Sequence, residues 1–188
     1  MKIGLFFGSF NPIHIGHLII ANHVVEHTDL EQIWFVISPQ NPLKSSSGLL
    51  NEYHRLHLVQ LAIENDARFK ASNIEFKLPR PSYTIDTLAY LSEKYPKHHF
   101  SIIMGGDSYN NLNKWKNHEL ILKNFSILVY NRDGFVPETK STSTSFLQAP
   151  FLNISSTFIR NEIKLGNSVK YLVPELVFNE LEVTNYYK

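Results

Sequence analysis

The chain has 188 residues, with 18 Lys and Arg against 17 Asp and Glu, and it contains no cysteine. This balance lacks the surplus of cations that nucleic-acid binding requires, and the absence of cysteine excludes disulfides and thiolate chemistry. No stretch approaches a membrane-spanning length, and the apolar run near the N-terminus is too short for a secretory signal. We therefore expect a cytoplasmic protein with a single domain over residues 1–188, which binds neither nucleic acid nor membrane.

Strand and helix patterns alternate along the chain. Short apolar runs that end at small residues predict buried strands, whereas apolar residues spaced three and four apart predict helices. In chain order the predicted elements are strand Ile3–Phe7, helix Leu18–Val25, strand Ile33–Ile37, helix Glu52–Glu64, strand Phe69–Phe76, helix Thr84–Lys94, strand Phe100–Met104, helical parts of Leu112–Leu122, strand Phe125–Tyr130, helix Ser156–Lys164 and helix Pro174–Val183. In the helix Glu52–Glu64, the residues expected on successive turns are Leu56, Val59, Gln60 and Ile63.

This alternation predicts an α/β fold. Parallel strands joined by right-handed crossovers form a doubly wound, Rossmann-like parallel sheet with helices on both faces, here followed by a C-terminal helical segment. The stretch Arg132–Pro150, which contains the run KSTSTS, has no periodicity and is predicted to be a loop.

The segment GSFNPIHIGH, Gly8–His17, directly follows the first predicted strand. In doubly wound sheets ligands bind beyond the carboxyl ends of the strands, so a ligand is expected beside this segment. Gly8 and Ser9 let the backbone approach a ligand closely, and the N–H groups at the start of the next helix favour an anion. His14 and His17 add two further N–H donors, which suggests an oligophosphate.

Other interpretations of the histidines stay open. In isolation, the pattern of His14 and His17 is about as often explained by capping or surface roles. His23 and His27 have the i, i+4 spacing of a metal-ligand pair, which would suggest zinc, but no carboxylate or further histidine stands in an obvious completing position. We therefore expect no residue of the chain to serve as a metal ligand.

The segment ISSTFIR, Ile154–Arg160, predicts a second anion site. Ser155, Ser156 or Thr157 would cap the helix that follows, which leaves its first N–H groups facing solvent or ligand. Arg160 would project from the first turn of that helix, where its planar fork suits a phosphate. A capped helix with a surface arginine is the simpler alternative, and for this segment alone it is the commoner arrangement.

Together, GSFNPIHIGH and ISSTFIR resemble the corresponding motifs of the His-x-Gly-His nucleotidyltransferase superfamily. More narrowly, the chain resembles the family of bacterial nicotinate mononucleotide adenylyltransferases. The further segments that carry this resemblance are Arg80–Leu88, Ile103–Asp107 with Leu112 and Trp115, Arg132, and Tyr171–Pro174. The resemblance implies a transfer of the adenylyl group of ATP to nicotinate mononucleotide in NAD biosynthesis, which yields nicotinate adenine dinucleotide and pyrophosphate.

The resemblance also implies roles for individual residues. The ATP site would contain Gly8, Ser9, Phe10, His14, His17, Gly105, Asp107, Ser155, Ser156 and Arg160. The groups that act on the reacting phosphates would be His14, His17, Lys44 and Arg160. The nicotinate nucleotide would contact Tyr83, Thr84, Trp115 and Arg132. The Mg²⁺ that accompanies ATP would be held mostly by phosphates and water.

Three of these residues have simpler explanations. Asp107 could be the N-cap of a helix after Gly106. Trp115 could be an ordinary core residue, and Arg132 a loop residue. These alternatives affect the acceptor side of the site more than the ATP side.

The chain departs from the family pattern at three places. Asn11 stands where many bacterial members have Asp, and Asn41–Lys44 lacks the histidine of the corresponding family loop. Asp133 replaces a proline that is common after the Arg132 position. We expect these changes to affect acceptor binding and loop closure rather than the ATP site.

Two other functions remain as alternatives. A phosphopantetheine adenylyltransferase or a cytidylyltransferase would share the histidine pair, but it would have no use for Arg80–Leu88 and Trp115. A non-catalytic nucleotide sensor would keep the pocket but could lose its phosphate-binding cations. The sequence leaves open whether the chain forms a homo-oligomer.

Overall fold

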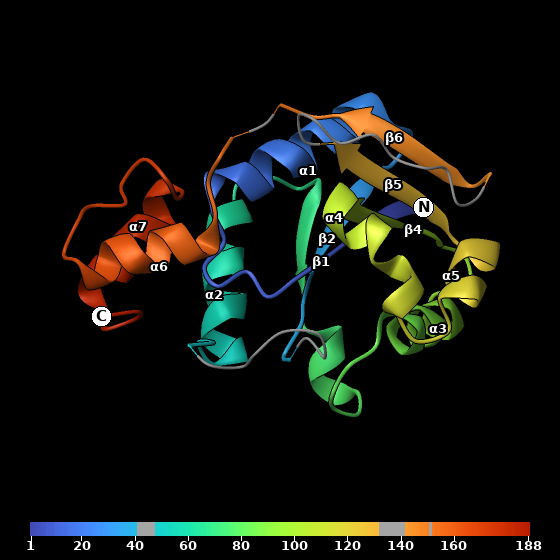
Figure 1. Ribbon diagram of the computed structural model, residues 1–188, viewed down its shortest axis with the longest axis horizontal. Helices are drawn as coiled ribbons and strands as arrows, with labels where there is room; N and C mark the ends of the chain where they lie inside the picture. Colours follow the sequence, from blue (N-terminus) through green and yellow to red (C-terminus); the bar gives the residue numbers. More distant parts are fainter. Residues whose placement is uncertain (41–47, 132–141, 151) are drawn as a thin grey trace.

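The computed structural model describes residues 1–40, 48–131, 142–150 and 152–188. A sheet of six parallel strands, in the order β3-β2-β1-β4-β5-β6, forms its centre (Figure 1). The strands are β1 (Lys2–Gly8), β2 (Gln32–Ile37), β3 (Phe69–Ser72), β4 (His99–Gly105), β5 (Ser126–Asn131) and β6 (Thr144–Gln148). Because successive strands are added outward on either side of β1 and β4, the topological switch point lies between these two strands.

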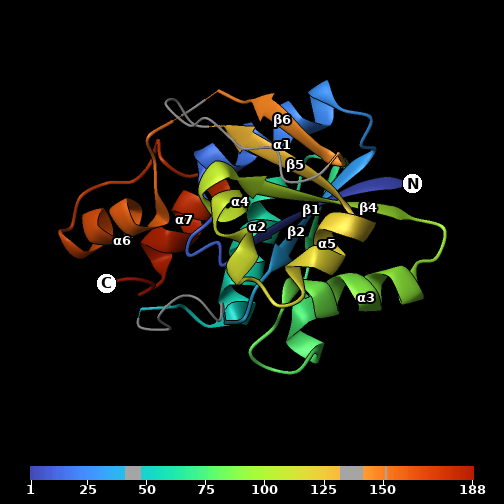
Figure 2. The same cartoon turned by 45° about the vertical axis from the view of Figure 1, so that its right-hand side comes forward.

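Helices connect the strands and flank the sheet. They are α1 (Ile15–His27), α2 (Glu52–Ile63), α3 (Thr84–Lys94), α4 (Gly106–Asn110), α5 (His118–Asn124), α6 (Ser156–Lys164) and α7 (Glu175–Val183), with 3₁₀ turns η1 (Ile74–Lys77) and η2 (Leu112–Lys114). Figures 1 and 2 both show α6 and α7 at one end of the molecule and α3 and α5 at the other. Within the described residues, no helix is both long and apolar enough to cross a membrane.

Each face of the sheet has its own hydrophobic core. Phe6 and Phe35 pack with residues of α1, α2, α6 and α7, whereas Leu5 and Trp34 pack on the opposite face with residues of α3, α4 and α5. Neighbouring residues of one strand thus enter different cores, which explains the continuous apolar runs in the sequence. The predicted doubly wound fold with helices on both faces is confirmed.

Two element predictions were wrong in part. The predicted loop Arg132–Pro150 contains β6, which pairs with β5 and packs Phe146 against Tyr109 at a ring distance of 5.7 Å. The strand predicted over Phe69–Phe76 ends at Ser72, where η1 follows shortly.

The buried face of α2 also differs from the prediction. Gln60 is exposed, and a charged residue, Arg55, is buried with Leu58, Val59 and Ile63. Positions 55, 59 and 63 follow the i, i+4, i+8 spacing of one helical face. The charge at position 55 concealed this face in the sequence.

Candidate active site

The carboxyl end of β1 carries a tightly packed loop. Phe10 has a positive φ of 45°, and its ring lies over Gly8, where an added Cβ would come within 2.8 Å of the ring. Phe10 is only 2% exposed and meets the His17 ring edge-on at 5.1 Å. The Phe10 side chain therefore supports His17 from the core, and only its backbone is left to contact a ligand.

The glycine between the two histidines has a packing role. His14 is the N-cap residue of α1 and is 6% exposed, and its ring stacks on that of His17 at 3.7 Å. An added Cβ on Gly16 would lie 3.1 Å from the His14 ring. A side chain at position 16 would therefore crowd the histidine pair.

The backbone of His14 also fixes the orientation of His17. The His14 N–H donates to Nδ1 of His17 at 3.2 Å, so Nδ1 is an acceptor and carries no proton. In a neutral imidazole the proton then resides on Nε2. His17 can thus present an N–H donor from Nε2 without being charged.

The structure brings the two predicted anion-binding segments together. Ser156 Oγ donates to the Pro12 carbonyl at 2.9 Å, and Arg160 Nη1 donates to the Asn11 carbonyl at 2.8 Å. Ser155 is the N-cap of α6, because its hydroxyl accepts from the Phe158 N–H at 3.1 Å. The start of α6 is therefore fastened directly to the loop after β1.

Asn11 joins this loop to two other segments. Its Oδ1 accepts from the Leu50 N–H at 3.1 Å and from the Tyr187 hydroxyl at 2.8 Å, and its Nδ2 donates to the Gly48 carbonyl at 3.0 Å. Burial raises the pKa of Tyr187, which keeps its hydroxyl protonated as a donor. A carboxylate could not donate to Gly48, so these contacts fit the amide that distinguishes this chain at position 11.

The end of β4 lies beside that of β1. Gly105 is the N-cap of α4, and an added Cβ there would lie 3.0 Å from the Tyr130 hydroxyl. Asp107 is exposed in the first turn of α4, and its carbonyl accepts from the side chain of Asn111 at 2.9 Å. The alternative interpretation of Asp107 as the N-cap was therefore wrong, because Gly105 holds that position.

Two predicted acceptor residues lie at the start of α3. Tyr83 is the N-cap residue and Thr84 begins the helix, as predicted. Lys116 connects this end of α3 to the segment of Trp115, because its Nζ lies 2.9 Å from an Asp86 carboxylate oxygen and 4.8 Å from the centre of the Tyr83 ring.

Trp115 itself is partly buried and packs against the core beneath α3 and α5. Trp115 is therefore part of the hydrophobic core, as the simpler explanation predicted. Because the residue is only partly buried, part of its ring remains accessible. Lys44 and Arg132 lie outside the described residues.

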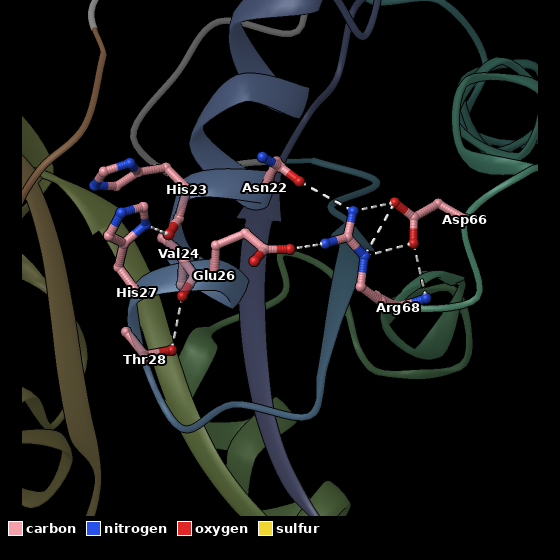
Figure 3. Close-up of polar contacts among 8 residues, drawn as sticks. All are labelled: Asn22, His23, Val24, Glu26, His27, Thr28, Asp66 and Arg68. Atoms are coloured by element: carbon pink, nitrogen blue, oxygen red, sulfur yellow. Dashed lines mark hydrogen bonds and ion pairs between the residues drawn. The ribbon is translucent and has the colours of Figure 1, made fainter.

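The structure gives no support to a zinc site at His23 and His27. Their rings stack at 4.0 Å, and His27 Nδ1 donates to the His23 carbonyl at 2.9 Å (Figure 3). Burial, and then the neighbouring His27, lower the pKa of His23. Within the described residues, no group of three His, Cys, Asp or Glu side chains could hold a metal ion.

Sequence reasoning missed two buried charged residues next to the site, Arg55 and Glu75, which are 0% and 2% exposed. For Arg55 the helical spacing with Val59 and Ile63 was a usable signal. Glu75 gives no comparable signal, because its burial depends on a short 3₁₀ turn that the sequence did not reveal.

Three comparisons relate the chain to known proteins. The sequence profile of the cytidylyltransferase-like family matches residues 5–162. A Flavobacterium johnsoniae protein named probable nicotinate-nucleotide adenylyltransferase is 52% identical over 192 residues, which cover 100% of both chains. A Bacteroides thetaiotaomicron protein of the same name is 44% identical over 179 residues, which cover 92% of this chain and 87% of the other. The Plasmodium falciparum nicotinic acid mononucleotide adenylyltransferase, solved with NaAD, shares the fold with a TM-score of 0.83 at 22% identity, over 99% of this chain and 97% of that one.

Proposed function

Because the chain belongs to the cytidylyltransferase-like family, among its nicotinate-nucleotide adenylyltransferases, we propose that it transfers the adenylyl group of ATP to nicotinate mononucleotide. The products are nicotinate adenine dinucleotide and pyrophosphate, and the reaction belongs to NAD biosynthesis in the cytoplasm. The observation that carries the proposal is the attachment of α6 to the loop after β1 through Ser156 and Arg160. This attachment brings the start of α6 and Arg160 to the loop that carries the histidine pair, and that loop follows β1 at the switch point of the sheet.

The reaction needs positioned charge rather than a base. A phosphate monoester is largely ionised at neutral pH, so an oxygen of nicotinate mononucleotide can attack the α-phosphorus of ATP directly. The new P–O bond forms as the bond from the α-phosphorus to the bridging oxygen breaks, and pyrophosphate leaves with the electron pair. Catalysis then consists of alignment and stabilisation of the charge that develops on the phosphates.

His17 is the best-defined donor for that charge. Its Nδ1 accepts from the His14 N–H, so in the neutral ring Nε2 carries the proton and is the donor. Phe10 and the stacked His14 ring hold the imidazole in place. Such a preorganised donor needs little rearrangement when the transition state forms.

Arg160 serves the phosphates from α6. Nη1 is bound to the Asn11 carbonyl and Nη2 contacts the Thr157 hydroxyl at 3.2 Å. A guanidinium has five N–H groups, so these two contacts leave donors for the β- and γ-phosphates. Ser155 and Ser156 contribute the start of α6, and Lys44 adds a further cation.

The start of α3 would receive the acceptor. Tyr83 and Thr84 stand where the first N–H groups of the helix favour the nicotinate carboxylate. Trp115 would stack on the pyridine ring, and Arg132 would meet the acceptor phosphate. Gly105 and Asp107, at the end of β4, would contact the ribose of ATP.

Mg²⁺ would enter this site bound to the phosphates of ATP. No cluster of ligating side chains occurs within the described residues, so the oligophosphate and water would supply most of its ligands. When bound, the ion neutralises charge on the leaving pyrophosphate.

The test is an assay of the purified protein with ATP, Mg²⁺ and a panel of acceptors, with pyrophosphate release as the readout. We expect kcat/KM for nicotinate mononucleotide to exceed that for the amide nucleotide by at least roughly tenfold. A hydrogen bond to a charged group contributes about 1.5–3 kcal/mol, against about 1 kcal/mol for a neutral one.

The panel also contains phosphopantetheine, and CTP replaces ATP in a parallel series. Equal use of the acid and the amide would contradict the acceptor assignment. Turnover only with phosphopantetheine or only with CTP would identify another transferase, and an absence of turnover with every pair would favour the nucleotide sensor.

A further inference from the structure

A buried arginine links the ends of two neighbouring strands. Nη1 of Arg55 donates to the Ser9 carbonyl after β1 at 2.5 Å and to the Ser38 carbonyl after β2 at 2.9 Å. Its Nη2 donates to the Pro39 carbonyl at 3.2 Å, and its Nε donates to the Leu50 carbonyl at 2.8 Å. Every one of these acceptors is a backbone carbonyl in a segment that borders the site.

The Arg55 guanidinium is fully buried, and burial lowers its pKa. Arginine nevertheless remains protonated in proteins, so a positive charge lies beneath the loop that begins with Ser9. Burying such a charge is costly unless its donors are satisfied. The four carbonyl contacts supply that satisfaction, and they constrain the backbone that makes them.

A buried glutamate holds the segment on the acceptor side through hydrogen bonds, as Arg55 holds the loop on the ATP side. The Ser82 hydroxyl donates to Oε2 of Glu75 at 2.8 Å, and the Thr87 hydroxyl donates to Oε1 at 2.9 Å. Ser82 directly precedes Tyr83, the N-cap residue of α3, and Thr87 lies in the first turns of that helix. Glu75 therefore holds the start of α3 through two hydrogen bonds, one from the residue before the N-cap and one from within the helix.

Ser38 follows β2 and lies next to both buried residues. Its carbonyl accepts from Arg55. Burial raises the pKa of the Glu75 carboxyl, and the side chains of Ser82, Thr87 and Ser38 oppose that rise. The end of β2 thus lies between Arg55, which holds the loop after β1, and Glu75, which holds the start of α3. Within the described part of the chain, neither Arg55 nor Glu75 belongs to an ion pair.

From this chain of contacts we infer that Arg55 and Glu75 are positioning residues that set the distance between the two substrates. Arg55 holds the loop that carries the ATP phosphates, and Glu75 holds the helix that carries the acceptor. The inference rests on the proposed function, because it assigns ATP and the acceptor to these two sides. Both residues act through backbone and hydroxyl groups and touch neither substrate.

The first test is Glu75→Gln, which keeps the shape of the side chain but turns one acceptor into a donor facing a hydroxyl. We expect the KM for nicotinate mononucleotide to rise about tenfold or more and the KM for ATP to change less than about threefold, because small misplacements of a binding element weaken its ligand strongly. Glu93→Gln, an exposed change on α3, is the matched control and should change neither KM.

The second test is Arg55→Lys, which keeps the charge but cannot reproduce the four contacts that Nε, Nη1 and Nη2 make. Here the KM for ATP should rise by about tenfold, and the KM for the acceptor should rise less. Arg68→Lys is the control, because Arg68 lies at the surface and binds the carboxylates of Asp66 and Glu26 (Figure 3). Ser38→Ala keeps the backbone carbonyl that accepts from Arg55, so it should leave the KM for ATP unchanged.

Nucleotide binding without turnover is measured by calorimetry on the same variants, and thermal melting shows whether each is folded. If Glu75→Gln fails to fold, Ser82→Ala removes one of its contacts and should give the same split in a weaker form. Equal changes in both KM values for Glu75→Gln and Arg55→Lys would overturn the inference, because a general loss of stability predicts no split.

The wild-type protein is assayed first. Failure to use nicotinate mononucleotide would refute the proposed acceptor, and the split is then measured with whichever nucleotide pair the wild type uses or binds. The failure of the proposed function and the failure of this inference therefore give different results.

Discussion

The two halves of the candidate site are built over very different spans of sequence. On the ATP side, Ser156 meets Pro12, Arg160 meets Asn11, and Tyr187 meets Asn11, across 144, 149 and 176 residues. On the acceptor side, Glu75 meets Ser82 and Thr87 across 7 and 12 residues. The ATP side therefore exists only in the complete fold, whereas much of the acceptor side is organised by neighbours in sequence.

This difference predicts which substitutions alter both binding elements and which have only local effects. A change in the loop after β1 or in α6 should affect both elements, since each holds the other through carbonyl contacts. A change near the start of α3 should stay local and alter acceptor binding alone. The predictions below separate the two halves by their KM and kcat effects.

The largest effect is expected for His17→Ala, which removes the oriented Nε2–H donor from the ATP side. We expect kcat to fall by roughly 10²–10³, the scale for loss of one transition-state donor. Melting temperature should change little, because His17 is only half-buried. His99→Ala, an exposed change at the far end of β4, is the control. Near-normal turnover of His17→Ala would remove this residue from the mechanism.

A smaller effect is expected for Arg160→Lys. An ammonium cannot hold the Asn11 carbonyl and a phosphate in the fixed geometry of a guanidinium, so the KM for ATP should rise by about tenfold. The acceptor KM should change less, as measured by titrating each substrate at saturating concentrations of the other. The reverse pattern would assign Arg160 to the acceptor.

Trp115→Ala should weaken the acceptor side alone. Loss of ring stacking should raise the KM for the acid and the amide nucleotide alike, by about tenfold, while their ratio stays nearly constant. The ratio is an internal control, since a rearranged α3 would change the discrimination as well. An unchanged KM for both nucleotides would leave Trp115 with its core role only.

The smallest effect is expected for Tyr187→Phe, which removes only the hydroxyl that donates to Asn11. Loss of this buried hydrogen bond should lower the free energy of unfolding by about 1 kcal/mol, measured by urea denaturation. If the long-range contacts of the ATP side matter as described, the KM for ATP should rise slightly while that of the acceptor does not. Tyr53→Phe, at an exposed position, should change neither quantity.

The sequence revealed the sheet and the chemical motifs because each is local. Ile3–Phe7 shows a buried strand by its continuous apolar run, and the strand β4 is equally clear. Thr84–Lys94 and Ser156–Lys164 were predicted with the same bounds as α3 and α6, since both helices have clear start and stop signals.

What the sequence concealed depends on distant partners. The strand β6 consists partly of Ser and Thr, and it becomes a strand by pairing with β5 at the edge of the sheet. Arg55 and Glu75 look like surface charges until the carbonyls and hydroxyls around them are known. Neither β6 nor Glu75 has a pattern that a short window of sequence could display, whereas Arg55 shares the helical spacing of Val59 and Ile63.

A ribosome delivers Asn11 long before it delivers Ser156, Arg160 and Tyr187. While the chain is being made, the loop after β1 lacks the partners that later fasten it, although β1 and β2 can already be available for pairing. Nascent chains cut short before α6 would therefore carry the histidine motif without an assembled phosphate site. The phosphate site is thus completed only when the C-terminal helices have been synthesised. Unfinished chains should therefore not bind ATP.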